Sequence, residues 1–416
     1  MSSNRSAIAG LCVVGFLARA SYSLARTPVL PLFAASFGVG PEAIGFAVAI
    51  STVTGIFFKM PAGVLSDVIG RTRTLLLGLG VFAFVPFAYL WVSSFELLVV
   101  VRFFHGFATA IYSPVVMAVV VSVAGSRRAE LLSWFSSVTI IGNLVGAPLG
   151  GLLLSLLGGD SGPRLEHFHI VYGIVAASGM ASLLLALMIV PRTDEAIIGG
   201  RTVAAVFKQF RTAIHEILLD RRVLLTSNME GVQNLTVGAL EAFLPLYAVT
   251  VCGLSAFQAG TLWGIQILAV ISTKPLMGKI SDRHGRTSLV FWGMFVCAVP
   301  FGLIPWTQNY WILLLLAMCF GLGEAMVTSS AAALVVDFCN EAHLGSAMGA
   351  FGTLFDVGHA AGPLLAGFFI GLSGDQDFRM AFAAIALLVV LAAVAFRTGV
   401  KEGGAMPQNA LKGGTP

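Results

Sequence analysis

The stretch Gly63-Val64-Leu65-Ser66-Asp67-Val68-Ile69-Gly70-Arg71-Thr72-Arg73 decides the fold, because its pattern occurs twice. The second half of the chain contains Gly278-Lys279-Ile280-Ser281-Asp282-Arg283-His284-Gly285-Arg286, and both copies read G-x-x-S-D-x-x-G-R. Each copy lies between two long apolar runs and follows a Lys, either Lys59 or Lys274, placed four residues before its first Gly. A polar loop repeated at matching places in two apolar halves predicts a duplicated membrane bundle.

The composition excludes a soluble globular protein. Of the 416 residues, 57% are hydrophobic and only 11% are charged, whereas soluble domains carry about 25% charged residues. The net charge of +4 is small and gives no indication of nucleic-acid binding. The five cysteines have no C-x-x-C spacing, so we interpret them as apolar packing residues rather than as a disulfide framework or a metal site.

Apolar runs of about 20 residues predict transmembrane helices, because lipid offers the backbone no hydrogen-bond partners. The runs are too uniformly apolar for barrel strands, whose residues alternate. The first run continues to Ala35, which is too long for a signal peptide, so we expect an uncleaved first span. Twelve spans are predicted, at 8–35, 42–66, 73–92, 96–123, 130–157, 167–191, 222–252, 256–280, 287–306, 309–337, 342–371 and 379–397.

These spans predict an all-α membrane protein of two pseudo-symmetric six-helix domains. We expect the domains at 1–191 and 222–398, a cytoplasmic linker with a short interfacial helix at 192–221, and a disordered cytoplasmic tail at 399–416. Most of the 24 Lys and Arg residues lie in alternate connecting segments that include both termini, and only Arg164 and Arg379 lie in the others. By the positive-inside rule, both termini are expected in the cytoplasm.

The two halves also match outside the loops. Leu30-Pro31-Leu32-Phe33-Ala34 ends the first span, and Leu244-Pro245-Leu246-Tyr247-Ala248 ends the seventh. Gly142 and Gly146 in the fifth span have counterparts in Gly358 and Gly362 of the eleventh. Matched features in the same order indicate an internal duplication of the kind that builds secondary transporters.

Over essentially its whole length the sequence resembles the major facilitator superfamily. The loops at 63–73 and 278–286 look like that family's motif between spans two and three and its echo between spans eight and nine. Arg102-Phe103-Phe104-His105-Gly106-Phe107-Ala108-Thr109-Ala110 looks like the span-four motif, with His105 in place of the usual Gln. Gly142-Asn143-Leu144-Val145-Gly146-Ala147-Pro148-Leu149-Gly150-Gly151 resembles the span-five motif of the proton-coupled antiporter branch, with its Pro displaced by one residue.

The resemblance implies twelve spans in the major facilitator fold and transport by alternating access. A small-molecule substrate would lie near the bilayer midplane between the domains, which would rock around it. The resemblance also implies a multi-pass protein of the cell's inner membrane that functions as a monomer and needs no cofactor.

The duplicated loop predicts a latch that forms in one transport state and breaks in the other. Asp67 could accept hydrogen bonds from a helix N-terminus and pair with an Arg, while Gly63 would allow close helix approach and Gly70 a tight turn. The alternative is that the arginines only enforce topology. The latch residues are Gly63, Asp67, Gly70, Arg71, Arg73, Gly278, Asp282, Gly285 and Arg286.

Glycine and proline in spans five and eleven predict either close helix packing or a gate hinge, because small residues permit close approach and Pro bends a helix. The residues are Gly142, Gly146, Pro148, Gly358, Gly362 and Pro363.

Ionisable residues within the spans are costly in lipid, so we expect them to face a cavity or a partner. They would carry protons, contact substrate, or form ion pairs that only hold the domains together. The candidates are Arg19, Arg102, His105, Glu230, Glu324, Asp356 and His359. Extension toward the lipid interface is the remaining alternative, and it fits Lys59 and Lys274 best. Asp356 and His359 alone are too few for a metal site.

Arg26 and Glu241 are predicted to pair across the domain interface as an outer gate. Arg26 precedes Pro31 in span one, and Glu241 precedes Pro245 in span seven, so their depths match. The repeat relates these two spans, which face each other in the family that the chain resembles.

The sequence thus predicts a secondary active transporter, with proton-coupled efflux of a small amphipathic organic compound as the favoured activity. Transport of an organic anion, a sugar or a metal ion remains an alternative, as does a non-transporting receptor or scaffold. No enzyme is expected, because H-E-x-x-H and G-x-S-x-G are absent, and the missing G-x-x-x-x-G-K-[ST] argues against nucleotide-driven transport.

Overall fold

The computed structural model is all-helical and describes residues 2–124, 128–159, 162–190, 221–338, 344–374 and 377–400. Within these ranges, the side chains at 2–8, 64, 67, 122, 124, 128–130 and 344–346 are not described. The predicted linker at 192–221 and the tail at 399–416 lie almost wholly outside the described residues.

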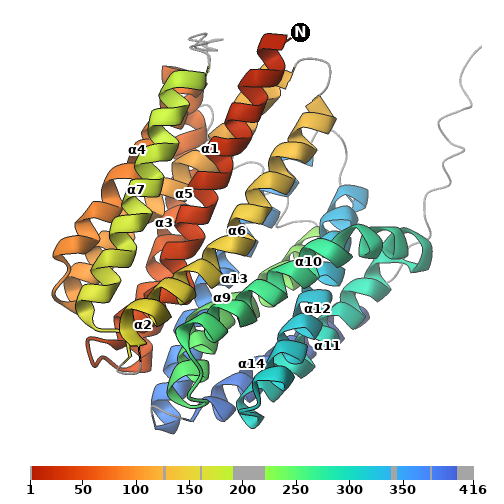
Figure 1. Ribbon diagram of the computed structural model, residues 1–416. Helices are drawn as coiled ribbons and strands as arrows, with labels where there is room; N and C mark the ends of the chain where they lie inside the picture. The colour runs from red at the N-terminus through yellow and green to blue at the C-terminus, as the bar shows by residue number, and fades with distance from the viewer. Residues whose placement is uncertain are drawn as a thin grey trace, which may run out of the picture.

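The first half of the chain forms one group of helices (Figure 1). Its long helices follow one another through short connections, as expected for neighbouring antiparallel spans. In chain order they are α1 (Ser2–Arg26), α2 (Val29–Ala35), α3 (Pro41–Ile69), α4 (Arg71–Ala88), α5 (Phe95–Ala124), α6 (Arg128–Gly158) and α7 (Leu165–Ile189), with a 3-10 turn η1 (Tyr89–Trp91) after α4.

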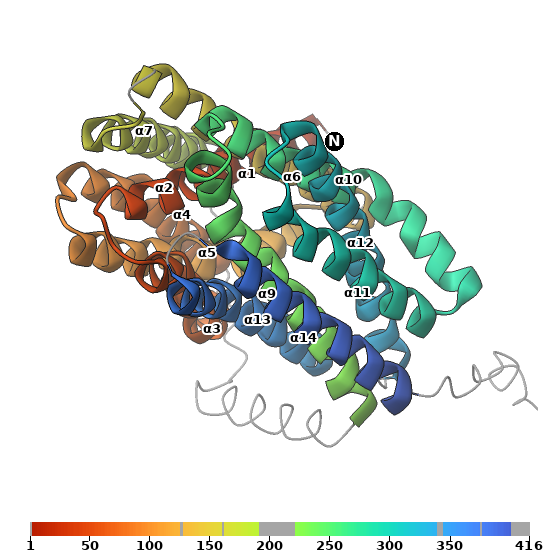
Figure 2. The same ribbon diagram turned by 90° about the horizontal axis from the view of Figure 1, so that it is seen from below.

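The second half repeats this order beside the first (Figure 2). Its elements are α9 (Arg221–Thr250), α10 (Ala256–His284), α11 (Arg286–Leu303), η4 (Ile304–Trp306), α12 (Tyr310–Phe338), α13 (Leu344–Ser373) and α14 (Phe378–Gly399). Gly70 separates α3 from α4 and Gly285 separates α10 from α11, with φ of 98° and 91°. Only glycine adopts such angles readily, which confirms the predicted turns.

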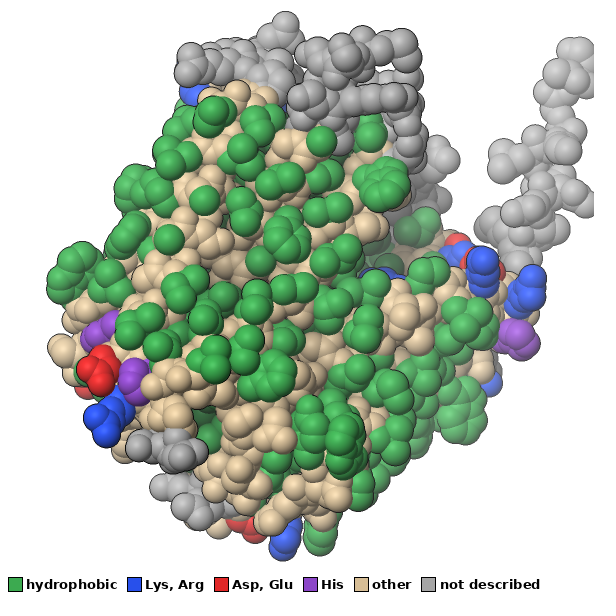
Figure 3. Space-filling model, in the orientation of Figure 1, with side chains coloured by type: hydrophobic (Ala, Val, Ile, Leu, Met, Phe, Trp, Pro, Cys, Tyr) green, Lys and Arg blue, Asp and Glu red, His purple; other side chains and the backbone are tan. Residues whose placement is uncertain are grey.

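The predicted first span at 8–35 is wrong as a single helix. The chain breaks after Arg26, and Pro28 precedes the short helix α2. Among the described residues, ten helices are long and apolar enough to span a membrane. The helices outside that set are α1 with α2, which are divided by the break, and α9, which carries buried polar groups such as Glu230, Gln233 and Glu241. On the face seen in Figure 3, apolar side chains are spread over the bundle between its ends.

Glycines hold the helices of each half close together. In the first half, Gly142 and Gly146 of α6 lie directly against the backbone of α1, near Phe16 and Ala20. In the second half, Gly358 and Gly362 of α13 lie against the backbone of α9, near Gly231 and Leu235. The glycine pairs singled out in the sequence therefore pack within each half, as small residues do in membrane helices.

The two halves meet most closely at the end of the bundle away from the N-terminus. Gly45, near the start of α3, abuts the carbonyl of Pro363 in α13. Gly260 and Gly264, near the start of α10, pack against Ala147 and Pro148 of α6. Pro148 and Pro363, the prolines of the predicted hinges, therefore contact the opposite half. The glycines of the same predicted hinges pack against their own half, namely Gly142, Gly146, Gly358 and Gly362.

Toward the end that carries the N-terminus the halves diverge (Figure 1). A Cβ placed on Gly63, Gly278, Gly349 or Gly352 would meet no atom within 4 Å. Gly63 and Gly278 therefore make no close helix contact in this conformation, and the latch stays a prediction. The molecule is closed at one end of the interface and open at the other.

Candidate functional site

An ion pair links the two halves near the middle of the interface. Arg26, the last residue of α1, contacts the carboxylate of Glu241 in α9 through its Nε atom. The same guanidinium reaches Thr52 of α3 at 3.3 Å and His359 of α13 at 2.7 Å. His359 also lies 2.9 Å from Glu241, so helices of both halves converge on one cluster of charge.

A second ion pair crosses the interface one helical turn away. Lys59 of α3 donates to Asp356 of α13 at 2.5 Å, and 38% of the Lys59 side chain remains exposed. The alternative that Lys59 extends toward the lipid interface is therefore wrong, because its ammonium is held by an acid of the other half. Asp356 precedes His359 by one turn on the side of the open end, so the two ion pairs form successive layers.

The first half buries a cationic and aromatic cluster beside this interface. Arg102 of α5 is fully buried and donates to Ser51 at 2.5 Å, while its Nε and Nη1 atoms have no hydrogen-bond partner among the described residues. His105 lies 3.1 Å from the Tyr89 hydroxyl, and Tyr89 stacks on Tyr172 with ring centroids 3.9 Å apart. Arg102 is thus a buried cation surrounded by hydroxyls and rings rather than by carboxylates.

Arg19 lies apart from this cluster. It donates to Ser113 of α5 at 3.1 Å, within its own half.

The second half buries an acidic and amide-rich cluster. Glu230, Gln233 and Asn234 lie on α9, and all three are at most 2% exposed. The Glu324 carboxylate of α12 accepts a hydrogen bond from the Gln266 amide of α10. Neither Glu230 nor Glu324 forms an ion pair with any residue that the structure describes. Glu230 is buried and Glu324 is partly buried, and the Lys274 ammonium of α10 acts on both acids electrostatically without forming an ion pair.

The repeated loop motifs are only partly visible. Arg286 pairs with Asp282 at 3.3 Å and with Asp337 of α12 at 2.7 Å, so this copy of the motif holds α12 of its own half. The side chain of Asp67, on which the first copy depends, is outside the described part of the structure. Arg71 and Arg73 begin α4.

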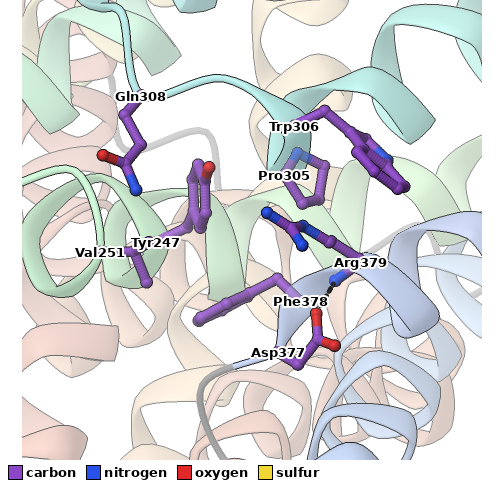
Figure 4. Close-up of a pocket in the computed structure, with 8 residues that line it drawn as sticks. All are labelled: Tyr247, Val251, Pro305, Trp306, Gln308, Asp377, Phe378 and Arg379. Atoms are coloured by element: carbon purple, nitrogen blue, oxygen red, sulfur yellow. Dashed lines mark hydrogen bonds between the residues drawn. The ribbon is translucent and has the colours of Figure 1, made fainter.

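A cavity of about 470 Å³ lies at the closed end of the second half, away from the ion pairs of the interface (Figure 4). Tyr247, Trp306, Gln308, Asp377 and Arg379 line it, and the Arg379 guanidinium stacks on the Trp306 ring at 4.9 Å. The Tyr247 hydroxyl donates to the Thr307 carbonyl at 2.9 Å, which fixes one wall. Its position at the end of α9 and α14 separates this cavity from the interface between the halves.

Sequence reasoning missed the polar neutral residues of the site. Tyr22, Ser51 and Thr52 surround the arginines, and Gln233 with Gln266 surround the acids. Gln233 and Asn234 follow Glu230 within an apolar span, so this local polarity was a usable signal. Among the residues that the structure describes, no group of three or more His, Cys, Asp or Glu side chains could hold a metal ion.

The family model described as Major Facilitator Superfamily matches residues 11–273 and 231–413. Among curated proteins, an uncharacterized MFS-type transporter of Methanocaldococcus jannaschii is 22% identical over 91% of this chain and 92% of its own length. The quinolone resistance protein NorA of Staphylococcus aureus is 20% identical over 90% of this chain and 93% of its own. The multidrug resistance protein MdtG of Serratia proteamaculans is 23% identical over 91% and 90%.

Solved structures share the same fold. A point mutant of the nucleoside transporter NupG has a TM-score of 0.79 at 15% identity, and the match covers 95% of this chain and 100% of that one. A bacterial homolog of the human lysosomal transporter Spinster, in an inward-facing and unoccupied conformation, has a TM-score of 0.76 at 14% identity, covering 95% and 97%.

Proposed function

This chain belongs to the Major Facilitator Superfamily and is a multi-pass secondary transporter, and on that premise we propose that it exports a small amphipathic organic compound in exchange for protons. The substrate would bind between the halves, next to the buried acids of α9 and α12. The likeness to proteins named for quinolone and multidrug resistance supports efflux, although identity is about one fifth.

One observation carries the proton coupling: Glu230 is buried and Glu324 partly buried in the second half, and neither forms an ion pair among the described residues. A carboxylate in such surroundings is costly, so the group gains a proton when sealed and loses it when water enters. The Asn234 amide beside Glu230 and the Gln266 amide beside Glu324 can hydrogen-bond either form of the acid. Alternating access would expose this cluster to one side of the membrane and then to the other.

In this proposal both termini are cytoplasmic and the protein works as a monomer. The closed end is then the outer end, and the structure corresponds to an inward-open state. The Arg26–Glu241 pair acts as the outer gate, and Lys59–Asp356 adds a second link one turn further in. The loops at 63–73 and 278–286 act as latches at the inner end.

The test uses the purified protein in liposomes, after a thermal-shift screen of amphipathic compounds has identified a substrate that stabilises it. Glu324→Gln and Glu230→Gln are compared with wild type. We expect loss of uphill transport driven by a pH gradient in at least one variant, with downhill exchange of labelled substrate preserved. Glu96→Gln is the matched control, because Glu96 is exposed at the start of α5. Full gradient-driven transport in both variants would falsify the proposed coupling.

A second candidate, transport of an organic anion, is favoured by one observation. Arg102 buries two N–H-bearing nitrogens that have no partner in the described part of the chain, and guanidinium groups recognise carboxylate and phosphate well. Competition between a cationic dye and an organic anion in the same liposomes decides between the candidates. Inhibition of substrate transport by the anion alone would favour this second function.

A further inference from the structure

The Nε2 atom of His359 lies in a position that no single protonation state satisfies. It is 2.7 Å from Nη2 of Arg26, which can only donate a hydrogen bond. It is also 2.9 Å from Oε2 of Glu241, which as a carboxylate can only accept one. In the neutral tautomer that carries its proton on Nδ1, Nε2 accepts from Arg26 and faces Glu241 with a lone pair. In the imidazolium, which this tautomer becomes on proton uptake, Nε2 donates to Glu241 and faces Arg26 with an N–H group.

The rest of the ring gives no relief from this conflict. The Nδ1 atom of His359 is buried without a hydrogen-bond partner in the described part of the chain. The ring lies parallel to that of Phe355, at 3° and 6.2 Å between centroids, which holds its orientation. Arg26 and a protonated His359 meet different oxygens of Glu241, Oε1 and Oε2, but their own N–H groups then face each other at 2.7 Å as two cations.

Loss of the contact between Arg26 and Glu241 would release the two halves, because each of these residues keeps another partner in its own half. Glu241 on α9 and His359 on α13 both belong to the second half, so their bond survives when the halves part. Arg26 in the first half keeps Thr52 at 3.3 Å and the face of the Tyr22 ring at 5.7 Å. When the halves part, the contacts of Arg26 with Glu241 and His359 must break.

We propose that His359 is a proton-binding residue of the gate: proton uptake by its ring sets a second cation against Arg26, leaves Glu241 bonded to His359 and so releases the link between the halves. The protonated fraction of an imidazole grows as the pH falls. Acidification should therefore open the end of the interface that is closed here. This inference rests on the proposed proton coupling and extends it to a second kind of residue beyond the buried acids.

The charged groups around the ring allow this exchange. Arg26 faces it from α1 and Glu241 from α9, and α3 contributes Lys59, which is bonded to Asp356 one turn away on α13. Arg102 of α5 adds positive potential at Glu241. A positive charge on His359 would repel Arg26 most strongly, because Arg26 is the cation in direct contact with the ring. The other charged residues of the cluster are Glu241, Asp356, Arg102 and Lys59.

The experiment measures the distance across the closed end as a function of pH. Spin labels are placed at Ser36→Cys, after α2, and Gln308→Cys, after η4, in a variant lacking the five native cysteines. Both positions are exposed at the closed end of opposite halves. Pulsed EPR in lipid nanodiscs between about pH 5 and pH 8, the range in which imidazole titrates, should show a longer-distance population that increases several-fold as the pH falls.

His359→Gln is the decisive variant. Its amide can accept from Arg26 and donate to Glu241 at once without titrating, so we expect a distance distribution that no longer responds to pH. His169→Gln is the matched control, because His169 bonds the Val92 carbonyl at 3.0 Å, away from the pair, and should keep the wild-type response. A flat wild-type response, or a wild-type response in His359→Gln, overturns the inference.

The same measurement separates this inference from the proposed function. If the distance between the labels changes with pH in wild type but not in His359→Gln, and a pH gradient does not drive transport, the role of His359 in the gate is supported and proton-coupled efflux is refuted. If a pH gradient drives transport while the distance stays constant, efflux stands and the role of His359 is refuted.

Discussion

At the residue scale, the site is a set of charges that link the two halves of the protein. Arg26 bonds Glu241 across the interface, and 19% of the Arg26 side chain is exposed although the Nε and Oε1 atoms that meet are buried. Partly wet ion pairs contribute about 1 kcal/mol, because desolvation offsets much of the attraction. A difference of that size still changes the ratio of two conformations several-fold. Such a pair can therefore shift the equilibrium between two conformations without holding the protein in one of them.

Removal of either partner should open the gate. We expect Arg26→Ala and Glu241→Ala each to increase the long-distance population between labels at Ser36→Cys and Gln308→Cys several-fold. The swap Arg26→Glu with Glu241→Arg should restore part of the closed population, because the opposite charges meet again. Additive effects of the single changes, with no rescue by the swap, would show that the residues do not act as a pair.

At the scale of the element, glycine determines how closely helices pack within a half. Gly362 of α13 lies directly against the Leu235 carbonyl of α9, and Gly146 of α6 against the Ala20 carbonyl of α1. A methyl group at either position would overlap a backbone carbonyl that cannot move without shifting its helix. The repeated spacing in spans five and eleven thus serves packing inside each half.

Gly362→Ala should destabilise the fold. Although Ala favours helix more than Gly does, overpacking against backbone costs about 1–3 kcal/mol. We expect a fall of several degrees in the Tm of the purified protein. Gly349→Ala on the same helix is the matched control, because a methyl group there meets no atom within 4 Å, and its Tm should stay level or rise. Equal Tm values for the two variants would contradict the packing role.

At the scale of the whole molecule, the interface between the halves is closed at one end and open at the other. The closed end rests on two helix crossings, α3 against α13 and α6 against α10, each built on glycine facing proline. Because these crossings join the halves and not the helices of one half, we expect them to affect which state is populated more than whether each half folds.

Gly45→Ala should therefore shift the conformation more than the stability. Its methyl group would overlap the Pro363 carbonyl of the opposite half, and the halves can relieve that overlap by parting. We expect the long-distance population between labels at Ser36→Cys and Gln308→Cys to increase, with a smaller change in Tm than Gly362→Ala causes. A large loss of Tm with an unchanged distance would show that this crossing belongs to the folding core.

The sequence by itself determined the class of fold and its duplication. Low charge and long apolar runs require helices in lipid, and the repeated loop motif with its turn glycines Gly70 and Gly285 marks equivalent places in two halves. The fold class and the duplication follow from composition and local spacing, which a single chain carries. The pairing of Arg26 with Glu241 was also predicted, because the repeat gives their depths, their charges are opposite, and the family that the sequence resembles places their spans face to face.

Only the tertiary structure decided which partners the other polar groups take. Lys59 meets Asp356 and Arg102 meets Ser51 and tyrosine rings, because helices distant in sequence cross at particular rotations that spacing alone leaves open. His359 gains its conflicting neighbours in the same way, from α1 and α9 at once. Helical periodicity gives the face on which a residue lies, and the packing of both halves determines what that face meets.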